Sequence, residues 1–194
     1  MRWLSFALVA LFAAFAATPS HARASASGAD TEERQIGACI HQVAKGRPWL
    51  EKTLWGLRDQ EAGWIGAAVL NSNGTHDLGP LQVNSWWVPR IARLLGQPEA
   101  DVRGWLRYDP CFNAEAARWI FLSALATAPD YWAAIGIYHS PTAWRQRRYA
   151  LLVADRLRDR FGPRIFGGVR ASGKDANICP RGEGMRCRGD YHSD

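Results

Sequence analysis

The chain has 194 residues with a formal net charge of +6, and 47% of its residues are hydrophobic. Once an export segment is set aside, the remaining length is that of a single domain. No segment after residue 24 is apolar enough to cross a bilayer, which excludes a mature protein that spans the membrane. The basic charge is compatible with the acidic peptide groups of a bacterial wall, while the export signal argues against nucleic acid as a partner.

Residues 1–24 have the pattern of a secretory signal peptide. Arg2 gives a basic start, and residues 4–17 form a nearly unbroken apolar run. Small residues occupy the cleavage positions in residues 20–22 (Ser-His-Ala) and 22–24 (Ala-Arg-Ala). An uncleaved anchor is the alternative, but the apolar run is short for a membrane span. We therefore predict a soluble mature protein in the periplasm.

The mature chain is predicted to begin with a loose segment. Residues 25–35 are mostly small and polar, which favours a flexible N-terminal segment. A first helix is expected over residues 36–43, and it contains Cys39. From there to residue 161 we expect one folded domain.

A second helix, over residues 49–63, carries the residue that dominates the functional interpretation. Leu50, Leu54 and Leu57 recur at helical spacing and form an apolar stripe. Glu61 continues this stripe four positions after Leu57, so its carboxylate is expected to point toward the core. The glycine at position 63 is expected to end the helix.

The segment that follows, residues 67–87, is rich in turn signals and polar groups. Asn73-Gly74 predicts a tight turn, and the region is expected to form a small hairpin or an irregular lobe. Asp77, Gly79, Gln82 and Asn84 lie among apolar residues. A glycine beside amide side chains permits close approach of a polar ligand to the backbone.

Five further helices are predicted from apolar residues at helical spacing, over residues 88–95, 99–106, 114–127, 131–137 and 142–160. Asn113 is expected to cap the third of these helices, and Asp130 begins the fourth. The residues expected to face inward are Ile91, Leu94, Leu95, Ala116, Ala117, Ile120, Phe121, Leu125, Tyr149, Leu152, Val153 and Leu157. Residues 162–194 read as a basic, Gly-rich tail.

Four cysteines in an exported chain predict two disulfides. We expect Cys39 to pair with Cys111 and Cys179 to pair with Cys187. The first bridge would close a long loop and stabilise the fold by about 4 kcal/mol in the chain-entropy model. A metal site built from Cys179, Cys187 and His192 is the alternative, although this spacing matches no common zinc pattern. We expect no metal and no cofactor.

The predicted position of Glu61 has chemical consequences. Desolvation disfavours the charged carboxylate and raises its pKa, and the negative end of the helix dipole acts in the same direction. A glutamate held in this way keeps its proton and serves as a general acid in glycosidic bond cleavage. The alternative is a structural ion pair with Arg58 or another cation.

Three short motifs raise the weight of the catalytic interpretation. Residues 61–63 (Glu-Ala-Gly) resemble the Glu-Ser-Gly motif of the lytic transglycosylases in the lysozyme superfamily. Residues 77–84 (Asp-Leu-Gly-Pro-Leu-Gln-Val-Asn) resemble their Gly-Leu-Met-Gln-Ile-Asn motif, and residues 137–139 (Ile-Tyr-His) resemble Ala-Tyr-Asn. The order and spacing of the three are more specific than any one of them. The resemblance covers roughly residues 36–157 and is closest to the small periplasmic transglycosylases that accompany conjugation and secretion machines.

This resemblance implies a mostly helical, lysozyme-like α+β fold with a small hairpin lobe. It implies that Glu61 acts first as acid and then as base, without a metal, on the bond between N-acetylmuramic acid and N-acetylglucosamine. The product is a 1,6-anhydro sugar. By the same resemblance, Gln82 binds sugar groups, Tyr138 orients the Glu61 carboxyl, and Gly79 and Asn84 belong to the substrate groove.

Two positions depart from the family pattern. Ala62 replaces the usual serine beside the acid, and His139 replaces asparagine. His139 is expected either to line the substrate groove or to cap the end of its helix. Neither change removes a group that the chemistry requires.

Tryptophan is abundant, with ten residues in the chain. Trp55 and Trp119 are expected in the core. Trp64, Trp86 and Trp87 flank the motif residues, where they are expected either to stack on sugars or to pack internally.

Two other functions remain open at this stage. A hydrolytic muramidase on the same fold would release reducing ends in place of anhydro ends. A non-catalytic wall-binding or assembly protein would retain the groove, although a binder has no need of a buried acid. The expected partners are peptidoglycan strands and components of a secretion or conjugation apparatus.

Overall fold

The computed structural model describes residues 20–166, with side chains from residue 28 onward. Most of the predicted signal peptide and nearly all of the C-terminal tail therefore lie outside the described residues. The predicted Cys179–Cys187 bridge and the alternative metal site with His192 lie outside them as well. No helix within residues 20–166 is long and apolar enough to cross a membrane.

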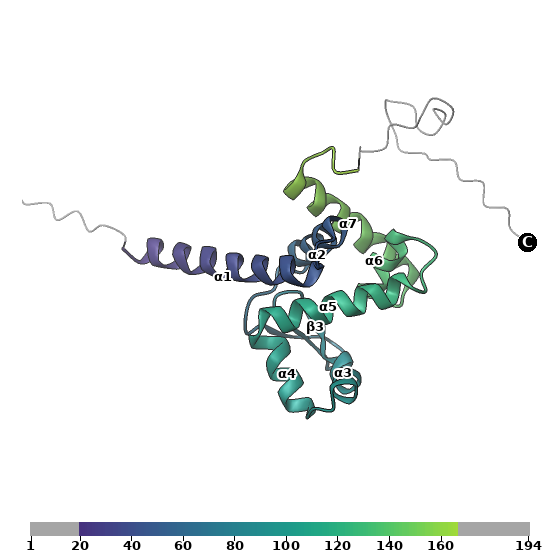
Figure 1. The fold of residues 1–194 in the computed structure, drawn as a ribbon, viewed down its shortest axis with the longest axis horizontal. Coiled ribbons are helices and arrows are strands. Elements are labelled where there is room, and N and C mark those ends of the chain that lie inside the picture. Colours follow the sequence, from purple (N-terminus) through teal and green to yellow (C-terminus); the bar gives the residue numbers. More distant parts are fainter. Residues whose placement is uncertain (1–19, 167–194) are drawn as a thin grey trace, which may run out of the picture. The chain divides into compact units, whose positions relative to one another are not determined.

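The mostly helical fold with a small hairpin is confirmed. Within the described residues there are seven α-helices and one three-stranded sheet (Figure 1). In chain order the elements are α1 (Ser20–Ala44), α2 (Pro48–Glu61), β1 (Ala68–Leu70), β2 (His76–Leu78), β3 (Val83–Asn84), the 3-10 helix η1 (Ser85–Trp87), α3 (Val88–Leu95), α4 (Glu99–Tyr108), α5 (Pro110–Leu125), α6 (Tyr131–His139) and α7 (Ala143–Phe161).

These elements form two compact units, each built from two stretches of chain. The first unit contains described residues up to Gly46 and residues 63–115. The second contains residues 47–62 and the described residues from Ala116 onward. Helix α5 contributes its first turns to the first unit and the remainder to the second.

In the first unit, the predicted turn at Asn73-Gly74 joins β1 to β2. The two strands are antiparallel, with Leu70 opposite His76. Gly74 has a φ of 81°, and the Asn73 side chain accepts hydrogen bonds from the backbone and hydroxyl of Thr75. A short third strand, β3, pairs with β2 and completes the sheet.

The N-terminal segment differs from the sequence-based expectation, because residues 25–35 lie within α1 and do not form a loose segment. No proline interrupts this stretch, and good helix formers follow its one glycine. The Glu32 carboxylate also accepts a hydrogen bond of 3.0 Å from the Ile65 backbone. The predicted Cys39–Cys111 disulfide is present and closes a loop of 72 residues.

Asn113 does not have the capping role predicted for it. Helix α5 begins earlier, at Pro110, and the Asp109 carboxylate accepts hydrogen bonds from the next two available backbone N–H groups, those of Cys111 and Phe112. Asn113 is fully buried. Its Oδ1 accepts from the Leu81 N–H at 2.9 Å, and its Nδ2 donates to the carbonyls of Leu78 and Leu106, both at 2.8 Å.

In the second unit, α7 packs against both α2 and α6. Glycines permit the close approach at each contact. A Cβ added at Gly56 on α2 would lie 2.9 Å from the Leu157 side chain. A Cβ added at Gly136 on α6 would lie 2.8 Å from the Cα of Gln146 on α7. The predicted stripe of Leu50, Leu54, Leu57 is fully buried, and so is most of the predicted inward face of α7.

Several predicted core positions are wrong. Leu94 and Leu95 are exposed, because α3 ends at once at Gly96 and buries only its earlier apolar residues, Val88, Ile91 and Ala92. Leu152 is also exposed and lines a pocket described below. Trp55 and Trp119 are half-buried, where full burial was expected.

The buried bonds of Asn113 lead to a prediction about stability. Asn113→Ala leaves one N–H and two carbonyls without this partner inside the first unit, at a cost of about 1–3 kcal/mol for each unsatisfied group. We expect the free energy of unfolding to fall by about 3 kcal/mol or more, measured by urea denaturation. Asn73→Ala, in the exposed turn, serves as the control and should cost less than about 1 kcal/mol. Equal losses for the two variants would contradict the role assigned to Asn113.

Candidate functional site

The helix that carries Glu61 ends immediately after it. Ala62 adopts a left-handed conformation with a φ of 50°, and its N–H donates to the Arg58 carbonyl at 2.8 Å. The stop is therefore at Ala62 and not at Gly63. A glycine is needed at position 63 for another reason, which is close packing. A Cβ there would lie 2.7 Å from Gln82 Nε2 and would also clash with the Gly79 carbonyl.

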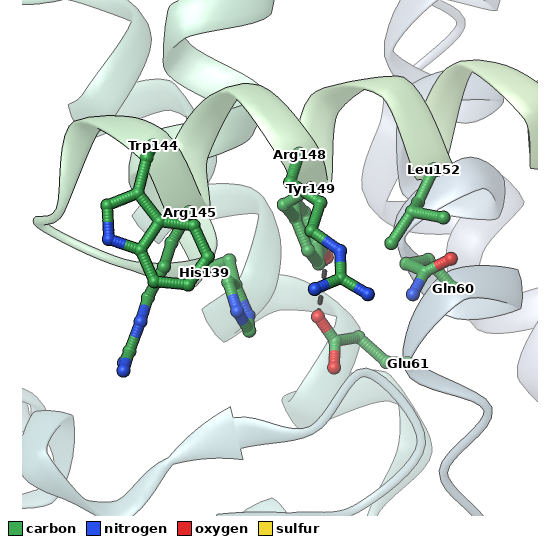
Figure 2. A pocket seen from close by; sticks show the side chains of 8 residues that line it. All are labelled: Gln60, Glu61, His139, Trp144, Arg145, Arg148, Tyr149 and Leu152. Carbon is green, nitrogen blue, oxygen red and sulfur yellow. Dashed lines mark hydrogen bonds between the residues drawn. The ribbon is translucent and has the colours of Figure 1, made fainter.

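The side chain of Glu61 is half-buried and accepts a hydrogen bond from α7. The Tyr149 hydroxyl donates to Glu61 Oε1 at 2.5 Å (Figure 2). Tyr149 is only 4% exposed, so the bond lies at the inner wall of the site. If Glu61 carries a proton, Oε2 is the favoured oxygen, because the carbonyl-type oxygen of a carboxylic acid is the better acceptor and Oε1 receives the phenol hydrogen. The bond therefore favours Oε2 as the oxygen that delivers a proton.

Burial raises the pKa of Tyr149 well above its ordinary value of 10.0. The neighbouring charge of Glu61, the proximity of Tyr138 and the hydrogen bond to Glu61 act in the same direction. The phenol therefore keeps its hydrogen and donates it throughout the neutral range.

The connection between α6 and α7 brings His139 to the same place. Gln146 contacts Gly136 and donates to the Ser140 carbonyl at 2.9 Å, which holds the end of α6 against α7. His139 is the last residue of α6, and its ring stacks on Tyr149 with centroids 4.5 Å apart and an interplanar angle of 1°. His139 therefore lines the pocket described next, and its contact with substrate stays a prediction.

A pocket of about 300 Å³ opens beside this arrangement within the second unit. Helix α7 provides most of its lining, and Figure 2 shows these side chains directed to the side on which Glu61 and His139 lie. The lining residues are Gln60, Glu61, His139, Trp144, Arg145, Arg148, Tyr149 and Leu152. Glu61 is the one carboxylate among them.

The second motif lies in the first unit, where Gly79 and Gln82 form a tight loop. Gly79 has a φ of 67°, and a Cβ there would clash with the Leu106 carbonyl. Gln82 has a φ of 49°, which is unusual for a residue with a side chain, and its Nε2 donates to the Gly79 carbonyl at 2.8 Å. Such backbone costs about 1 kcal/mol or more and occurs preferentially at functional sites. Sugar binding by Gln82 and Gly79 stays a prediction.

Asn84 uses its side chain to hold the same loop. Its Nδ2 donates to Asp77 at 2.8 Å and to Thr75 at 3.0 Å, and its Oδ1 accepts from the Trp86 backbone at 2.9 Å. Asn84 therefore has a structural role. Its contact with substrate stays a prediction, and so do those of the exposed Trp64 and Trp86.

Tyr149 is the site residue that sequence reasoning missed. It was predicted only as an inward residue of the last helix, and Tyr138 was assigned the task of orienting the acid. Tyr138 lies close enough to Tyr149 to affect its pKa. The sequence did contain a signal for this role, because Tyr149 was predicted to face inward and a buried phenol requires a hydrogen-bond partner.

Within residues 28–166, no group of three or more His, Cys, Asp or Glu side chains is arranged to hold a metal ion. No model of a known protein family matches the chain, and no curated protein gives a significant match. The three motifs and the geometry of the pocket are the features of this chain that indicate a function.

The raised pKa of Tyr149 predicts a pH dependence of stability. Above about pH 10 the unfolded phenol loses its proton while the native phenol retains it, so the free energy of unfolding falls as pH rises. Below about pH 10 both forms are protonated and this contribution is fully present. We expect Tyr149→Phe to lose less stability than wild type between about pH 9 and about pH 11, measured by urea denaturation.

Tyr108→Phe, which removes an exposed phenol, serves as the control and should follow the wild-type curve. If Tyr149→Phe instead loses stability as steeply as wild type over this range, the phenol does not retain its proton in the native state.

Proposed function

We propose that this protein is a peptidoglycan lytic transglycosylase in which Glu61 is the catalytic acid and base. The observation that carries the proposal is the hydrogen bond from Tyr149 to Glu61 Oε1 in an open pocket where Glu61 is the one carboxylate. The three sequence motifs that resemble those of transglycosylases also support the proposal. They contain Glu61, Gln82, and the pair Tyr138 and His139.

The proposed reaction uses the same carboxyl twice. Glu61 delivers the proton on Oε2 to the glycosidic oxygen, and the bond to C1 of N-acetylmuramic acid breaks as an oxocarbenium-like centre develops. The acetamido group of the substrate assists. The ionised Glu61 then accepts the proton of the C6 hydroxyl, whose oxygen attacks C1. This closes the 1,6-anhydro ring and returns Glu61 to its acid form.

The composition of the pocket favours this route over a two-carboxylate mechanism. Retaining glycosidases place a second carboxyl about 5 Å from the first. Among the described lining residues, Glu61 has no such companion. The other acid near the motifs, Asp77, accepts a hydrogen bond from Asn84.

We also propose the cellular compartment in which the protein acts. A disulfide between Cys39 and Cys111 suits an oxidising compartment, and the pattern of residues 1–24 is that of an export signal. We infer a periplasmic enzyme whose substrate is the glycan strand of the wall. Opening of the wall for a secretion or conjugation apparatus fits the resemblance of the motifs.

The first test of the proposal concerns the acid itself. We expect Glu61→Gln to fold normally and to lose about 10³-fold or more of its wall-degrading activity, because an amide cannot deliver the proton. Mass analysis of products released from purified peptidoglycan gives the readout, and wild type should release 1,6-anhydro ends. Glu51→Gln, which lies on the same helix and outside the pocket lining, is the matched control.

Two results would count against the proposal. Activity of Glu61→Gln within about tenfold of wild type, a change of roughly 1.4 kcal/mol in barrier, removes Glu61 from the chemistry. Release of reducing ends by wild type indicates a hydrolytic muramidase in place of a transglycosylase.

A second test concerns the positioning role of Tyr149. Tyr149→Phe removes the donor to Oε1, so protonation is no longer biased toward Oε2 and fewer carboxyl groups are correctly oriented. We expect turnover to fall about fivefold to tenfold, a smaller loss than for Glu61→Gln, with a shift in the pH–rate profile. Single-turnover rates across pH measure both effects.

Tyr131→Phe is the control for this second test. Its hydroxyl is largely buried in the same unit and shares a hydrogen bond of 2.7 Å with Thr53, away from the pocket lining. Tyr138→Phe tests the assignment made from the sequence. An unchanged pH–rate profile for Tyr149→Phe would indicate that its phenol has only a packing role.

A further inference from the structure

The pocket carries more positive charge than the proposed reaction uses. Arg145 and Arg148 line it together with His139, and the acid–base steps require only Glu61 and its tyrosine partner. We propose that Arg145 and Arg148 bind a carboxylate of the glycan substrate beside Glu61. This inference rests on the proposed function and names the chemical group that the site recognises.

The two arginines share one face of α7. Residues three apart on a helix are neighbours on its surface, so Arg145 and Arg148 act from the same side. Figure 2 shows the Arg148 side chain directed from α7 toward Glu61, while the Arg145 side chain extends from the same helix past the Trp144 ring. Trp144 is 55% exposed, and the Arg145 guanidinium lies 5.3 Å from its ring centroid. Arg145 is therefore held at the rim of the pocket.

Neither guanidinium is neutralised by an ion pair in the part of the chain that the structure describes. Arginines farther along α7 behave differently. Arg158 pairs with Asp155 at 2.6 Å, and Arg160 pairs with Asp59 at 2.5 Å. Of the arginines on α7 without an ion pair among the described residues, Arg145 and Arg148 line the pocket and Arg147 does not, so these two are the ones whose charge is available to a ligand there.

Arg145 and Arg148 lie near the N-terminal end of α7, where positive charge lowers the stability of a helix. The N-terminal end of a helix carries a partial positive charge and favours anions. The first turn of α7 nevertheless contains no acidic residue, and Thr142 provides no side-chain cap. Two arginines within the first two turns add to this positive potential. An anion in the pocket would be attracted by the guanidinium groups and by the helix end together.

The substrate supplies carboxylates of matching chemistry. Each N-acetylmuramic acid bears a lactyl group, which ends in a free carboxylate on bare glycan and is joined to an acidic peptide in the intact wall. A guanidinium fork fits a carboxylate through two parallel hydrogen bonds. Chitin oligosaccharides have the same backbone linkage and no carboxylate. The proposed site therefore distinguishes peptidoglycan from neutral glycans.

The experiment measures binding with three soluble probes: a chitin tetrasaccharide, a bare peptidoglycan tetrasaccharide with free lactyl carboxylates, and the same tetrasaccharide with its peptides. The full chain is compared with an Arg145→Gln/Arg148→Gln variant by titration of tryptophan fluorescence. We expect the variant to bind one or both anionic probes about tenfold more weakly and the chitin probe unchanged. Added salt should weaken wild-type binding of the anionic probes more than that of chitin.

Arg147→Gln is the matched control. Arg147 lies on the same turns and is exposed, but it is two residues from Arg145, about 200° round the helix, and it does not line the pocket. It should bind all three probes as wild type does. Weaker binding of the bare glycan by the double variant identifies the lactyl carboxylate as the bound group, and an effect confined to the third probe identifies a peptide carboxylate.

Three outcomes would overturn the inference. In the first, the double variant binds the anionic probes as tightly as Arg147→Gln does. In the second, the double variant also loses affinity for the chitin probe to the same extent, which indicates damage to the pocket. Alternatively, affinities are unchanged while turnover falls and the pH–rate profile shifts, which indicates that Arg148 serves Glu61 and not the substrate. Failure of wild type to release any product from peptidoglycan contradicts the proposed function instead, because the binding readout does not depend on turnover.

Discussion

The candidate site depends on one hydrogen bond, from the Tyr149 phenol to Glu61 Oε1. It joins the last residue of α2 to the buried face of α7, so both the acid and its orientation depend on how these helices pack. A carboxyl at a helix end has rotational freedom that would otherwise spread its proton over two oxygens and several directions. A donor that is itself buried, and whose pKa is raised by that burial, removes much of this freedom.

Two glycines make the packing possible. Gly56 lets α2 approach Leu157 on α7, and Gly136 lets α6 approach the backbone of α7 at Gln146. A methyl group at either position would separate helices whose spacing sets the distances among Glu61, Tyr149 and His139. These glycines lie in helix interiors, where glycine costs roughly 1 kcal/mol relative to alanine. The stability lost in the helices is offset by close contact between them.

The pocket combines the hydrogen-bonded pair Tyr149 and Glu61 with two arginines that have no ion pair among the described residues. Tyr149 and Glu61 form its inner wall, while Arg145 and Arg148 lie toward solvent on the same helix that provides the phenol. One helix thus supplies the group that orients the acid and the groups that are available to an anion. The position of Glu61 and the proposed recognition of a carboxylate would therefore both depend on the packing of α7. This arrangement also accounts for the exposure of Leu152, which faces the pocket where an inward position was expected.

The sequence by itself determined most of the helical elements, though not the first half of α1 or the start of α5, together with the hairpin turn at Asn73-Gly74, the apolar stripe that leads to Glu61, and the Cys39–Cys111 bridge. The helices and the turn follow from patterns that act over a few residues, namely apolar periodicity and turn chemistry. The disulfide follows from an even number of cysteines in a chain expected in an oxidising compartment. Only the tertiary structure decided that Tyr149 is the partner of Glu61, that Asn113 holds a distant loop by hydrogen bonds, and that Gly63 is needed for close packing while Ala62 ends the helix. The physical reason is that each of these depends on contacts between segments far apart in the chain. Glu61 and Tyr149 are 88 positions apart in the sequence. Apolar periodicity predicts that a residue faces the core, but it does not predict which residue of another helix it will contact.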